Sequence, residues 1–423
     1  MADDSGVVLV IGSAAQQYRE YLLSGASQRR QLWLLDGVES TWQRPYVVGT
    51  SVVELLDRDR LILDQPQLVD TAVRLAEQRQ VAGVFTYDET LVIATAHIAE
   101  ALGLPGMTID GADRCRDKHR TRQTLTEAGL PQPRFAMATT LEEARVAAGA
   151  MGYPLVLKPR GIGASIGVVR ADTAAELDTA FAVAERASHR GSPSYEDGVL
   201  VEELLTGPEI SIDGAIFDGE YCPFFLARKH VGLAPYFEEV GHVLSADDPL
   251  LDDPELAKVL IEAHDALGVR YGITHTEVLL TERGPAIVEV NGRLGGDLIP
   301  YLGKLATGID PGHIAVDVAT GMRPVIRPAK TGSVGIRFLY PPQDCRIRSV
   351  SLPEPRTRAG LLEAHAMAEP GTLLRLPPRA HVGRYAYLIC AADDPDTCNT
   401  RLNAAASLAA LSYDDAEDDS PPS

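Results

Sequence analysis

Two short segments of the chain alternate polar and apolar side chains and are separated by residues that favour a turn. Residues 274–280 and residues 286–291 each show this alternation, which predicts a β-hairpin. Because side chains alternate between the two faces of a strand, Glu289 and Asn291 project on one side, and pairing across the turn brings Glu277 beside them. Two carboxylates and an amide oxygen are ligands that a hard cation such as Mg²⁺, or else Mn²⁺, prefers. The hairpin therefore predicts a metal site.

Arg293 follows Asn291 by two residues, so it lies on the same side of an extended chain. Its forked guanidinium group suits a carboxylate or a phosphate. A hairpin face that merely contacts water would have the same composition. The metal interpretation therefore depends on whether the rest of the chain provides a nucleotide site.

A lysine pair and a glycine-rich turn offer groups that bind phosphate. Lys118 opens a predicted helix, and Lys158 ends an apolar strand that is followed at once by a turn containing Gly163, Ser165 and Gly167. Backbone N–H groups of such a turn, with lysine charge nearby, can hold phosphate oxygens. An ordinary hairpin turn would look similar, and the sequence contains no P-loop motif.

Residues 199–212 predict a strand, a short apolar bend and a second strand. With the lysines, the glycine-rich turn and the hairpin, they follow an order that resembles the ATP-grasp family, over residues 113 to about 319. The resemblance implies a site for ATP and for two metal ions. The implied phosphate ligands are Lys118 and Lys158, under a lid formed by Gly163, Ser165 and Gly167. Glu202, with the backbone of Glu203 and Leu205, would contact the edge of the adenine, and Glu209 would accept hydrogen bonds from the ribose hydroxyls. The implied metal ligands are Glu277, Glu289 and Asn291.

The segment of residues 228–242 is rich in charge, aromatic side chains and glycine. It is similar to an F-x-E-x-G-H segment of the L-amino-acid ligase branch of that family. The resemblance implies that Glu239 pairs with a substrate ammonium group, that His242 lines the pocket and that Arg293 holds the reacting carboxylate, with Lys158 completing the catalytic set. A plain surface loop, with a histidine of no special role, remains the alternative.

The first 112 residues predict a Rossmann-like α/β unit. Apolar strands at 7–13, 32–35 and 81–87 alternate with helical segments, which indicates a parallel sheet. No G-x-G-x-x-G follows the first strand, so an NAD-dependent dehydrogenase is disfavoured. Residues 86–89 come at the carboxyl end of a strand, where they could either meet a ligand or cap a helix.

The chain divides into segments of different predicted roles. The fold class expected is α/β, with α+β parts, and the divisions are a Rossmann-like domain (1–112), a lid subdomain (113–196), a nucleotide and metal subdomain (197–325), a C-terminal ligase domain (326–412) and an acidic tail (413–423). Within the C-terminal domain, residues 361–366 and 395–411 are expected to be helical. The tail is expected to be solvated and disordered.

Composition excludes several classes of partner. The 39 basic and 59 acidic side chains give a net charge of −20, which argues against nucleic-acid or anionic-membrane binding. The five cysteines are scattered without zinc-site spacing, and the acidic N-terminus has no signal-peptide character. A cytoplasmic protein is expected, and a homodimer is an assembly that the resemblance allows.

The chemistry implied is phosphorylation of a carboxylate by ATP, followed by attack of an amine on the acyl phosphate, with small carboxylic acids and amines, amino acids above all, as substrates. The alternatives are an ATP-grasp enzyme that acts on another carboxylate or on carbonate, as purine-pathway or biotin-carboxylase-like members do, and a nucleotide-binding module without turnover.

Overall fold

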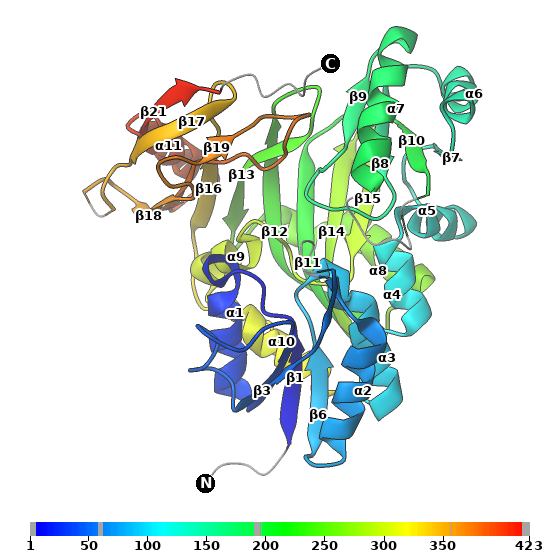
Figure 1. The fold of residues 1–423 in the computed structure, drawn as a ribbon, viewed down its shortest axis with the longest axis vertical. Helices are drawn as coiled ribbons and strands as arrows, with labels where there is room; N and C mark the ends of the chain where they lie inside the picture. Colours follow the sequence, from blue (N-terminus) through cyan, green and yellow to red (C-terminus); the bar gives the residue numbers. More distant parts are fainter. Residues whose placement is uncertain (1–5, 58–61, 190–194, 196, 356, 417–423) are drawn as a thin grey trace.

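The N-terminal unit is a four-stranded parallel sheet with strand order β3-β2-β1-β6 (Figure 1). The computed structural model describes residues 6–57, 62–189, 195, 197–355 and 357–416. All five residues of β1 are buried, as expected of a parallel strand covered on both faces. The elements are β1 (Val7–Ile11), α1 (Gln16–Arg29), β2 (Leu32–Asp36), β3 (Gly49–Val52), β4 (Leu55–Asp57), β5 (Ile62–Leu63), α2 (Gln65–Ala76), β6 (Val81–Phe85), η1 (Glu89–Leu91) and α3 (Val92–Leu102).

Two helices connect this unit to a small antiparallel sheet, which with its helices we call the lid subdomain. The connecting helices are α4 (Ile109–Arg116) and α5 (Lys118–Glu127). The sheet has the order β7-β10-β8-β9, from β7 (Phe135–Ala138), β8 (Leu155–Pro159), β9 (Val169–Ala171) and β10 (Val199–Glu203). Helices α6 (Leu141–Met151) and α7 (Ala174–Ser188) pack their apolar side chains against it.

The centre of the molecule is an antiparallel sheet of eight strands in the order β15-β14-β11-β12-β13-β16-β20-β18. Its first five strands and their helices are β11 (Glu209–Phe217), β12 (Glu220–Gly232), β13 (Glu238–Ser245), η3 (Pro249–Asp252), α8 (Pro254–Leu267), β14 (Gly272–Thr281), β15 (Gly284–Asn291), α9 (Ile299–Thr307) and α10 (Pro311–Ala319). The predicted hairpin is β14 and β15, and both its strands and its turn are as expected.

The C-terminal residues complete the same sheet. Strands β16 (Ser333–Leu339), β18 (Leu361–Ala366) and β20 (Ala386–Ala392) extend it beyond β13, and helix α11 (Pro395–Ala406) packs on them. Strands β17 (Cys345–Ser351), β19 (Leu373–Leu374) and β21 (Ala410–Asp415) form a separate sheet of order β19-β17-β21. We call residues 333–415 the C-terminal lobe, which is orange to red in Figure 1.

Two expectations about the C-terminal lobe are wrong, and the helix expected over residues 395–411 ends at Ala406. Residues 361–366 form strand β18 and not a helix, because they pair with the free edge of β20. Residues 413–415 belong to β21, which pairs with β17, so the predicted tail does not begin at Tyr413. The rest of that predicted tail, from residue 417, lies outside the described residues.

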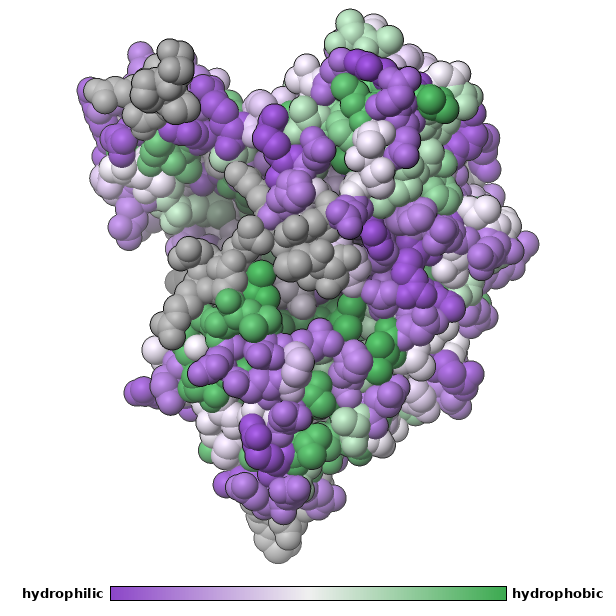
Figure 2. Space-filling model, turned by 45° about the vertical axis from the view of Figure 1, so that its right-hand side comes forward, coloured by the Kyte–Doolittle hydropathy of each residue, from purple (hydrophilic) through white to green (hydrophobic). Residues whose placement is uncertain are grey.

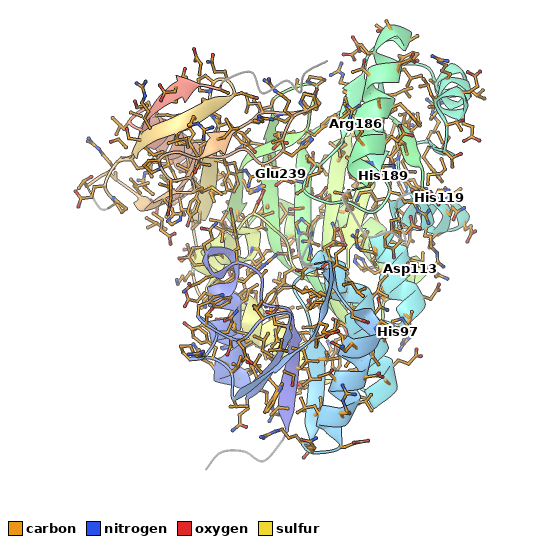
Figure 3. The ribbon with its side chains drawn as sticks, in the orientation of Figure 1. His97, Asp113, His119, Arg186, His189 and Glu239 are labelled. Atoms are coloured by element: carbon orange, nitrogen blue, oxygen red, sulfur yellow. The ribbon has the colours of Figure 1, made fainter. Side chains whose placement is uncertain are left out.

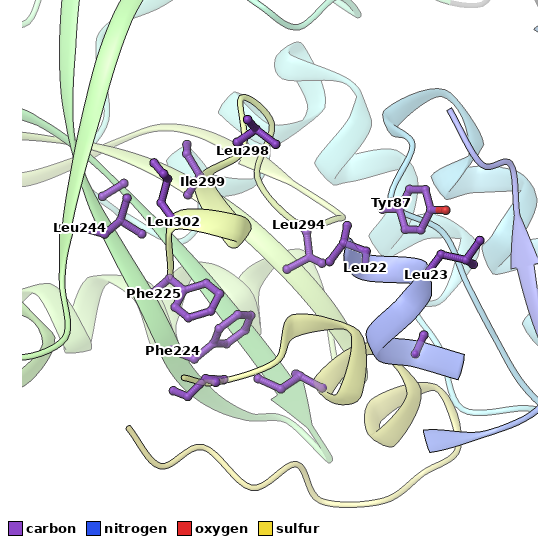
Figure 4. Close-up of a cluster of buried hydrophobic side chains, with 14 of the residues drawn as sticks. Leu22, Leu23, Tyr87, Phe224, Phe225, Leu244, Leu294, Leu298, Ile299 and Leu302 are labelled. Atoms are coloured by element: carbon purple, nitrogen blue, oxygen red, sulfur yellow. The ribbon is translucent and has the colours of Figure 1, made fainter. Parts of the chain in front are cut away.

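One apolar core joins the N-terminal unit to the central sheet (Figure 4). Leu22 and Leu23 of α1 belong to the same buried cluster as Phe225 of β12 and Leu302 of α9. Helix α10 packs against α1, and Asp317 accepts two hydrogen bonds from Arg29, at 3.0 and 2.8 Å. In the part of the chain that the structure describes, none of the helices has the length and apolar character that crossing a membrane requires.

His264, buried on α8, predicts an acid-sensitive fold. Its Nδ1 lies 2.6 Å from the Leu260 carbonyl oxygen, its Nε2 lies 2.7 Å from the Thr274 hydroxyl, and its ring stacks on Tyr221. Burial lowers the pKa of His264 from 6.5 to about 4. The unfolded chain therefore binds more protons than the folded chain between these two values, so the free energy of unfolding falls as the pH falls through that window.

We expect this histidine alone to remove about 2 kcal/mol of stability between pH 6.5 and pH 4.5. Urea unfolding at both values should show that His264→Gln loses less stability on acidification than the wild type. His365→Gln, a change at an exposed histidine, serves as the control and should keep the wild-type dependence. An equal dependence in all three proteins would contradict this role of His264.

Candidate active site

The candidate site is a cavity of about 640 Å³ between the lid subdomain, the central sheet and the C-terminal lobe. Figure 2 shows the notch between the two upper lobes of the molecule. Most of the predicted site residues line the cavity, namely Lys118, Lys158, Gly163, Ser165, Glu202, Glu203, Leu205, Glu209, Glu239, Glu277, Glu289, Asn291 and Arg293. Gly167 and His242 are not among the residues that line it. The topology thus gathers at one place groups that lie far apart in the sequence.

At one end of the cavity, Glu202 is held by two cations. Its carboxylate lies 2.7 Å from Arg122 Nε and 2.8 Å from Lys158 Nζ, and all three side chains are buried. Burial works against the charged forms, yet the pKa of Glu202 is lowered because Arg122 and Lys158 attract its carboxylate. Burial also lowers the pKa of Lys158, with Glu202 acting in the opposite direction. The carboxylate of Glu202 is therefore already engaged, and Arg122 is a member of the site that the motifs did not reveal.

The residues of the hinge after β10 line the cavity. The side chain of Glu203 points away to two arginines, with a carboxylate oxygen 2.7 Å from Arg134 Nε and another 3.2 Å from Arg283. Its backbone N–H donates to the Arg134 carbonyl at 2.9 Å. The side chain and the N–H of Glu203 are thus both engaged within the protein, and a role for main-chain atoms at this position stays a prediction.

Lys118 connects the glycine loop, residues 161–167, to the hairpin of β14 and β15. Its ammonium group donates to the Ile162 carbonyl oxygen at 2.8 Å and lies 2.8 Å from a carboxylate oxygen of Glu289. Asp117 caps helix α5 and accepts both bonds of the Arg160 guanidinium, at 2.8 and 2.6 Å. The start of α5 and the glycine loop are thereby held together over one end of β15.

The hairpin brings its three oxygen-bearing side chains together as the alternation predicted. Glu277 pairs with Glu289 across the two strands, and Asn291 is the next residue on the same face. In the amide orientation that satisfies hydrogen bonding, the Asn291 nitrogen donates to Glu289 at 3.0 Å and to Glu89 at 3.1 Å. Rotation of the amide would turn the Asn291 oxygen towards the two carboxylates. The three groups would then form a set of oxygen donors that suits a divalent cation. The residues present therefore fit a metal ion.

Glu89, at the start of η1, joins the site from the N-terminal unit. Its carboxylate lies 2.8 Å from Arg293 Nε and 3.8 Å from Arg116. Arg293 also donates to the Leu294 carbonyl oxygen at 2.6 Å. The capping interpretation of residues 86–89 is confirmed, since Asp88 caps η1, and contact of this segment with a ligand stays a prediction.

Lys229 of β12 is the cation that the sequence analysis missed. Its Nζ lies 2.7 Å from Glu209, 2.6 Å from Glu239 and 2.9 Å from Glu277. Burial would lower the pKa of Lys229, but these three carboxylates raise it well above its ordinary value. One lysine cannot neutralise three carboxylates: the pKa of Glu277 and that of Glu239 are lowered by Lys229, while burial raises that of Glu209. We call these four residues the Lys229 cluster.

His275 supplies a second positive charge beside the cluster. Its Nδ1 lies 2.8 Å from Asp213 and its Nε2 lies 3.8 Å from Glu277. Burial works against protonation, but Asp213 and Glu277 raise the pKa of His275 to about 9. Asp213 also accepts a hydrogen bond from the Gly295 N–H at 3.0 Å. The His-Thr-Glu sequence of β14 was the available signal, because period two places His275 on the face of Glu277.

Glu239 lies near the middle of the molecule, between the C-terminal lobe and the lid subdomain (Figure 3). His242 Nε2 is 3.2 Å from its carboxylate, and the ring of His242 lies edge-on to Phe338. Neither ring nitrogen of His242 makes a hydrogen bond of good geometry with a described residue. His242 is completely buried, and it contacts Glu239, which lines the cavity.

Three family models match this chain. They describe an ATP-grasp domain over residues 151–301, an ATP-grasp N-terminal domain over residues 42–106 and L-amino acid ligase C-terminal domain 2 over residues 337–414. A D-alanine–D-alanine ligase of Stutzerimonas stutzeri (strain A1501) is 31% identical over 228 residues, which are 50% of this chain and 68% of that ligase. The chain belongs to the ATP-grasp family. The match over residues 337–414 agrees with the expected L-amino-acid ligase branch.

Other similarities cover different shares of the chain. Alanine–anticapsin ligase of Bacillus subtilis (strain 168) is 30% identical over 276 residues, which are 60% of this chain and 57% of that ATP-grasp relative. This chain thus spans little more than half of that ligase. The crystal structure of L-amino acid ligase from Bacillus licheniformis superimposes with a TM-score of 0.77 and 22% identity, over 96% of this chain and 99% of that one. The predicted ATP-grasp fold is confirmed.

Proposed function

We propose that this protein is an ATP-dependent carboxylate–amine ligase that joins two amino acids or small peptide-like acids. The observation that carries the proposal is the Lys229 cluster, which links in one contact network the residue expected at the ribose (Glu209), the metal ligand Glu277 and the substrate-facing Glu239. A site that only stored a nucleotide would have no need for Glu239 in that network.

The reaction has two steps. A carboxylate oxygen of the first substrate attacks the terminal phosphorus of ATP, and the bond from that phosphorus to the ADP oxygen breaks. The amino group of the second substrate then attacks the acyl carbon, phosphate leaves, and the amine gives up a proton. Activation is required because a carboxylate is a poor electrophile, and the acyl phosphate must be kept from water.

The residues of this chain have separate tasks in these steps. Lys118 and Lys158 would neutralise charge on the phosphates, and the loop with Ser165 would cover them. Arg293 would hold the reacting carboxylate, since its guanidinium lies at the cavity wall beside Glu89. ATP-grasp ligases use ATP with a divalent metal, and here Mg²⁺ or Mn²⁺, as two ions, would be held by Glu277, Glu289 and Asn291 and would offset charge on the transferred group.

Glu239 is better suited to bind an ammonium group than to remove its proton. Burial alone would raise the pKa of its carboxylate, but Lys229 and His242 outweigh burial and hold that pKa well below its usual range. A carboxylate that holds protons so weakly is a poor general base at neutral pH. We infer that Glu239 orients the amino group of a substrate by charge, with His242 supporting it.

An ATP-grasp enzyme acting on another carboxylate or on carbonate is the second candidate, since such enzymes share this fold. The ligase is favoured by the similarity of residues 337–414 to L-amino acid ligase C-terminal domain 2. The free state of the five cysteines and the use of ATP fit a cytoplasmic location, and a homodimer is the assembly we expect.

The experiment that tests the proposal measures ADP and phosphate release with Mg²⁺ and ATP against L-amino acids, singly and in pairs, with mass detection of products. Release that requires two amino acids, with a product lighter by one water than their sum, is expected. ATP binding without any amino-acid-dependent release would move the substrate to the second candidate class.

Arg293→Ala should separate nucleotide binding from acyl transfer. The guanidinium contacts Glu89 and the Leu294 carbonyl rather than the lysines of the phosphate site, so ATP affinity should change less than about threefold. Peptide formation should fall about a hundredfold or more, because the reacting carboxylate loses its ligand. Titration of ATP and product analysis check both values. If the variant instead bound ATP more weakly but formed peptide normally once ATP was bound, Arg293 would be a ligand of the nucleotide and not of the reacting carboxylate.

A further inference from the structure

His381 of the C-terminal lobe contacts both the glycine loop and the substrate side of the cavity. Its Nε2 accepts a hydrogen bond from the Gly167 N–H at 3.4 Å, and its Nδ1 lies 2.8 Å from a carboxylate oxygen of Glu238. Glu238 immediately precedes Glu239 on β13. The side chain of His381 is 4% exposed. One ring thus connects three parts of the chain that surround the cavity.

The two contacts determine the protonation of the ring. A carboxylate only accepts hydrogen bonds, so Nδ1 carries the proton that bonds to Glu238. A backbone N–H only donates, so Nε2 must carry none in order to accept from Gly167. His381 therefore acts as a neutral bridge that donates at one end and accepts at the other.

The side of this bridge that faces the C-terminal lobe is firmly anchored. The second carboxylate oxygen of Glu238 accepts from the Val382 N–H and from the Tyr340 hydroxyl, both at 3.0 Å. Arg384 donates to that hydroxyl at 2.9 Å and makes two hydrogen bonds of 2.7 Å to Asp297, which follows the hairpin of β14 and β15. His381 is therefore held by an ordered network, and it can in turn fix the loop.

The loop end of the bridge lies where the glycine loop packs against α7. Gly167 has a φ of +76°, and a Cβ there would come within 2.3 Å of Ala187 Cβ, so the loop passes close to α7 at this point. The neighbouring contacts are the Arg170 N–H to the Pro235 carbonyl, at 3.1 Å, and an edge-on contact of His381 with Tyr236. The hydrogen bond from the Gly167 N–H to His381 joins the backbone of the glycine loop directly to a side chain of the C-terminal lobe.

We propose that His381 is a positioning residue that holds the glycine loop closed over the bound nucleotide and ties its closure to the substrate segment at Glu238. This role rests on the proposed function, because it requires that the loop cover the phosphates. Through this ring the C-terminal lobe then contributes to catalysis by keeping water away from the acyl phosphate.

A matched pair of substitutions separates the two ends of the ring. The amide of Asn at this position reaches about as far as Nδ1, so His381→Asn keeps the bond to Glu238 and loses the acceptor for Gly167. The longer side chain of His381→Gln reaches about as far as Nε2 and can accept from Gly167. His365→Asn makes the same chemical change at an exposed histidine that stacks on Tyr387, away from the loop.

The measurement is the Kd of the full-length protein for the β,γ-imido analogue of ATP with Mg²⁺, together with the ADP released per peptide formed. We expect His381→Asn to raise the Kd about 3- to 10-fold, as loss of one hydrogen bond does, and to release more than one ADP per peptide. His381→Gln keeps the acceptor for Gly167 but loses the bond to Glu238, so it should raise the Kd less than His381→Asn does, and His365→Asn should match the wild type.

The outcomes distinguish the two proposals. If the wild type binds the analogue but His381→Asn and His381→Gln share its Kd and its ratio of ADP to peptide, the positioning role is wrong while the ligase assignment stands. If the wild type does not bind the analogue, the proposed function itself is wrong. If the Asn and Gln variants lost affinity for the analogue equally and both had a lowered melting temperature, His381 would stabilise the fold and would not position the loop.

Discussion

Glu289→Gln is expected to reduce ADP release about a thousandfold while the protein stays folded. The substitution keeps the shape of the side chain but removes one of the two hairpin carboxylates predicted to bind metal, and a metal ion that offsets charge on a transferred phosphoryl group is worth several kcal/mol. It also leaves the ammonium group of Lys118, 2.8 Å away, without its ion-pair partner. The nucleotide site and the metal site therefore lose charge balance together.

The measurement is ADP release at saturating Mg²⁺, ATP and amino acids, with circular dichroism and thermal unfolding to check the fold. Glu282→Gln is the matched control, because Glu282 lies exposed in the turn of the same hairpin and does not line the cavity. The control should retain wild-type turnover. Full turnover by Glu289→Gln would show that the metal assignment to this hairpin is wrong.

Local patterns were sufficient to predict the hairpin of this site. Alternation with a period of two and a turn near Arg283 determine that Glu277 faces Glu289, and the structure has this register. The glycine loop and the strand before Lys158 were predictable for the same reason, since both depend on residues that are neighbours in the sequence. The ATP-grasp fold followed from the order of these segments.

Contacts between distant segments could not be predicted in this way. Arg122 is an ordinary helical arginine in the sequence, and its partner Glu202 lies 80 residues away on another element. Lys229 meets carboxylates from β11, β13 and β14, so its role depends on the order of strands in the sheet. Residues 361–366 contain good helix formers, yet the open edge of β20 makes them a strand, because tertiary pairing outweighs intrinsic propensity.

Lys229→Met is expected to be the most damaging single change in the molecule. It would leave Glu209, Glu239 and Glu277 around an apolar side chain with no ammonium group, and removal of one partner from a buried ionic network costs about 3–5 kcal/mol. Urea unfolding at pH 7 measures this loss. Lys258→Met is the control, because Lys258 is 71% exposed and its ion pair with Glu262 is long, at 3.9 Å.

The pH dependence of the variant provides a sharper test than its stability at one pH. In the wild type the pKa values of Glu239 and Glu277 are lowered by Lys229, so the stability they contribute is present above the ordinary glutamate pKa and is lost as the pH falls. Without the lysine, burial and mutual repulsion should raise the pKa values of these carboxylates, so that acidification from pH 7 to about pH 5 stabilises the variant relative to the wild type. If Lys229→Met lost no more stability than Lys258→Met and kept the wild-type pH dependence, Lys229 would not neutralise this cluster. Another group of the cavity would then have to connect the residues proposed for nucleotide, metal and substrate.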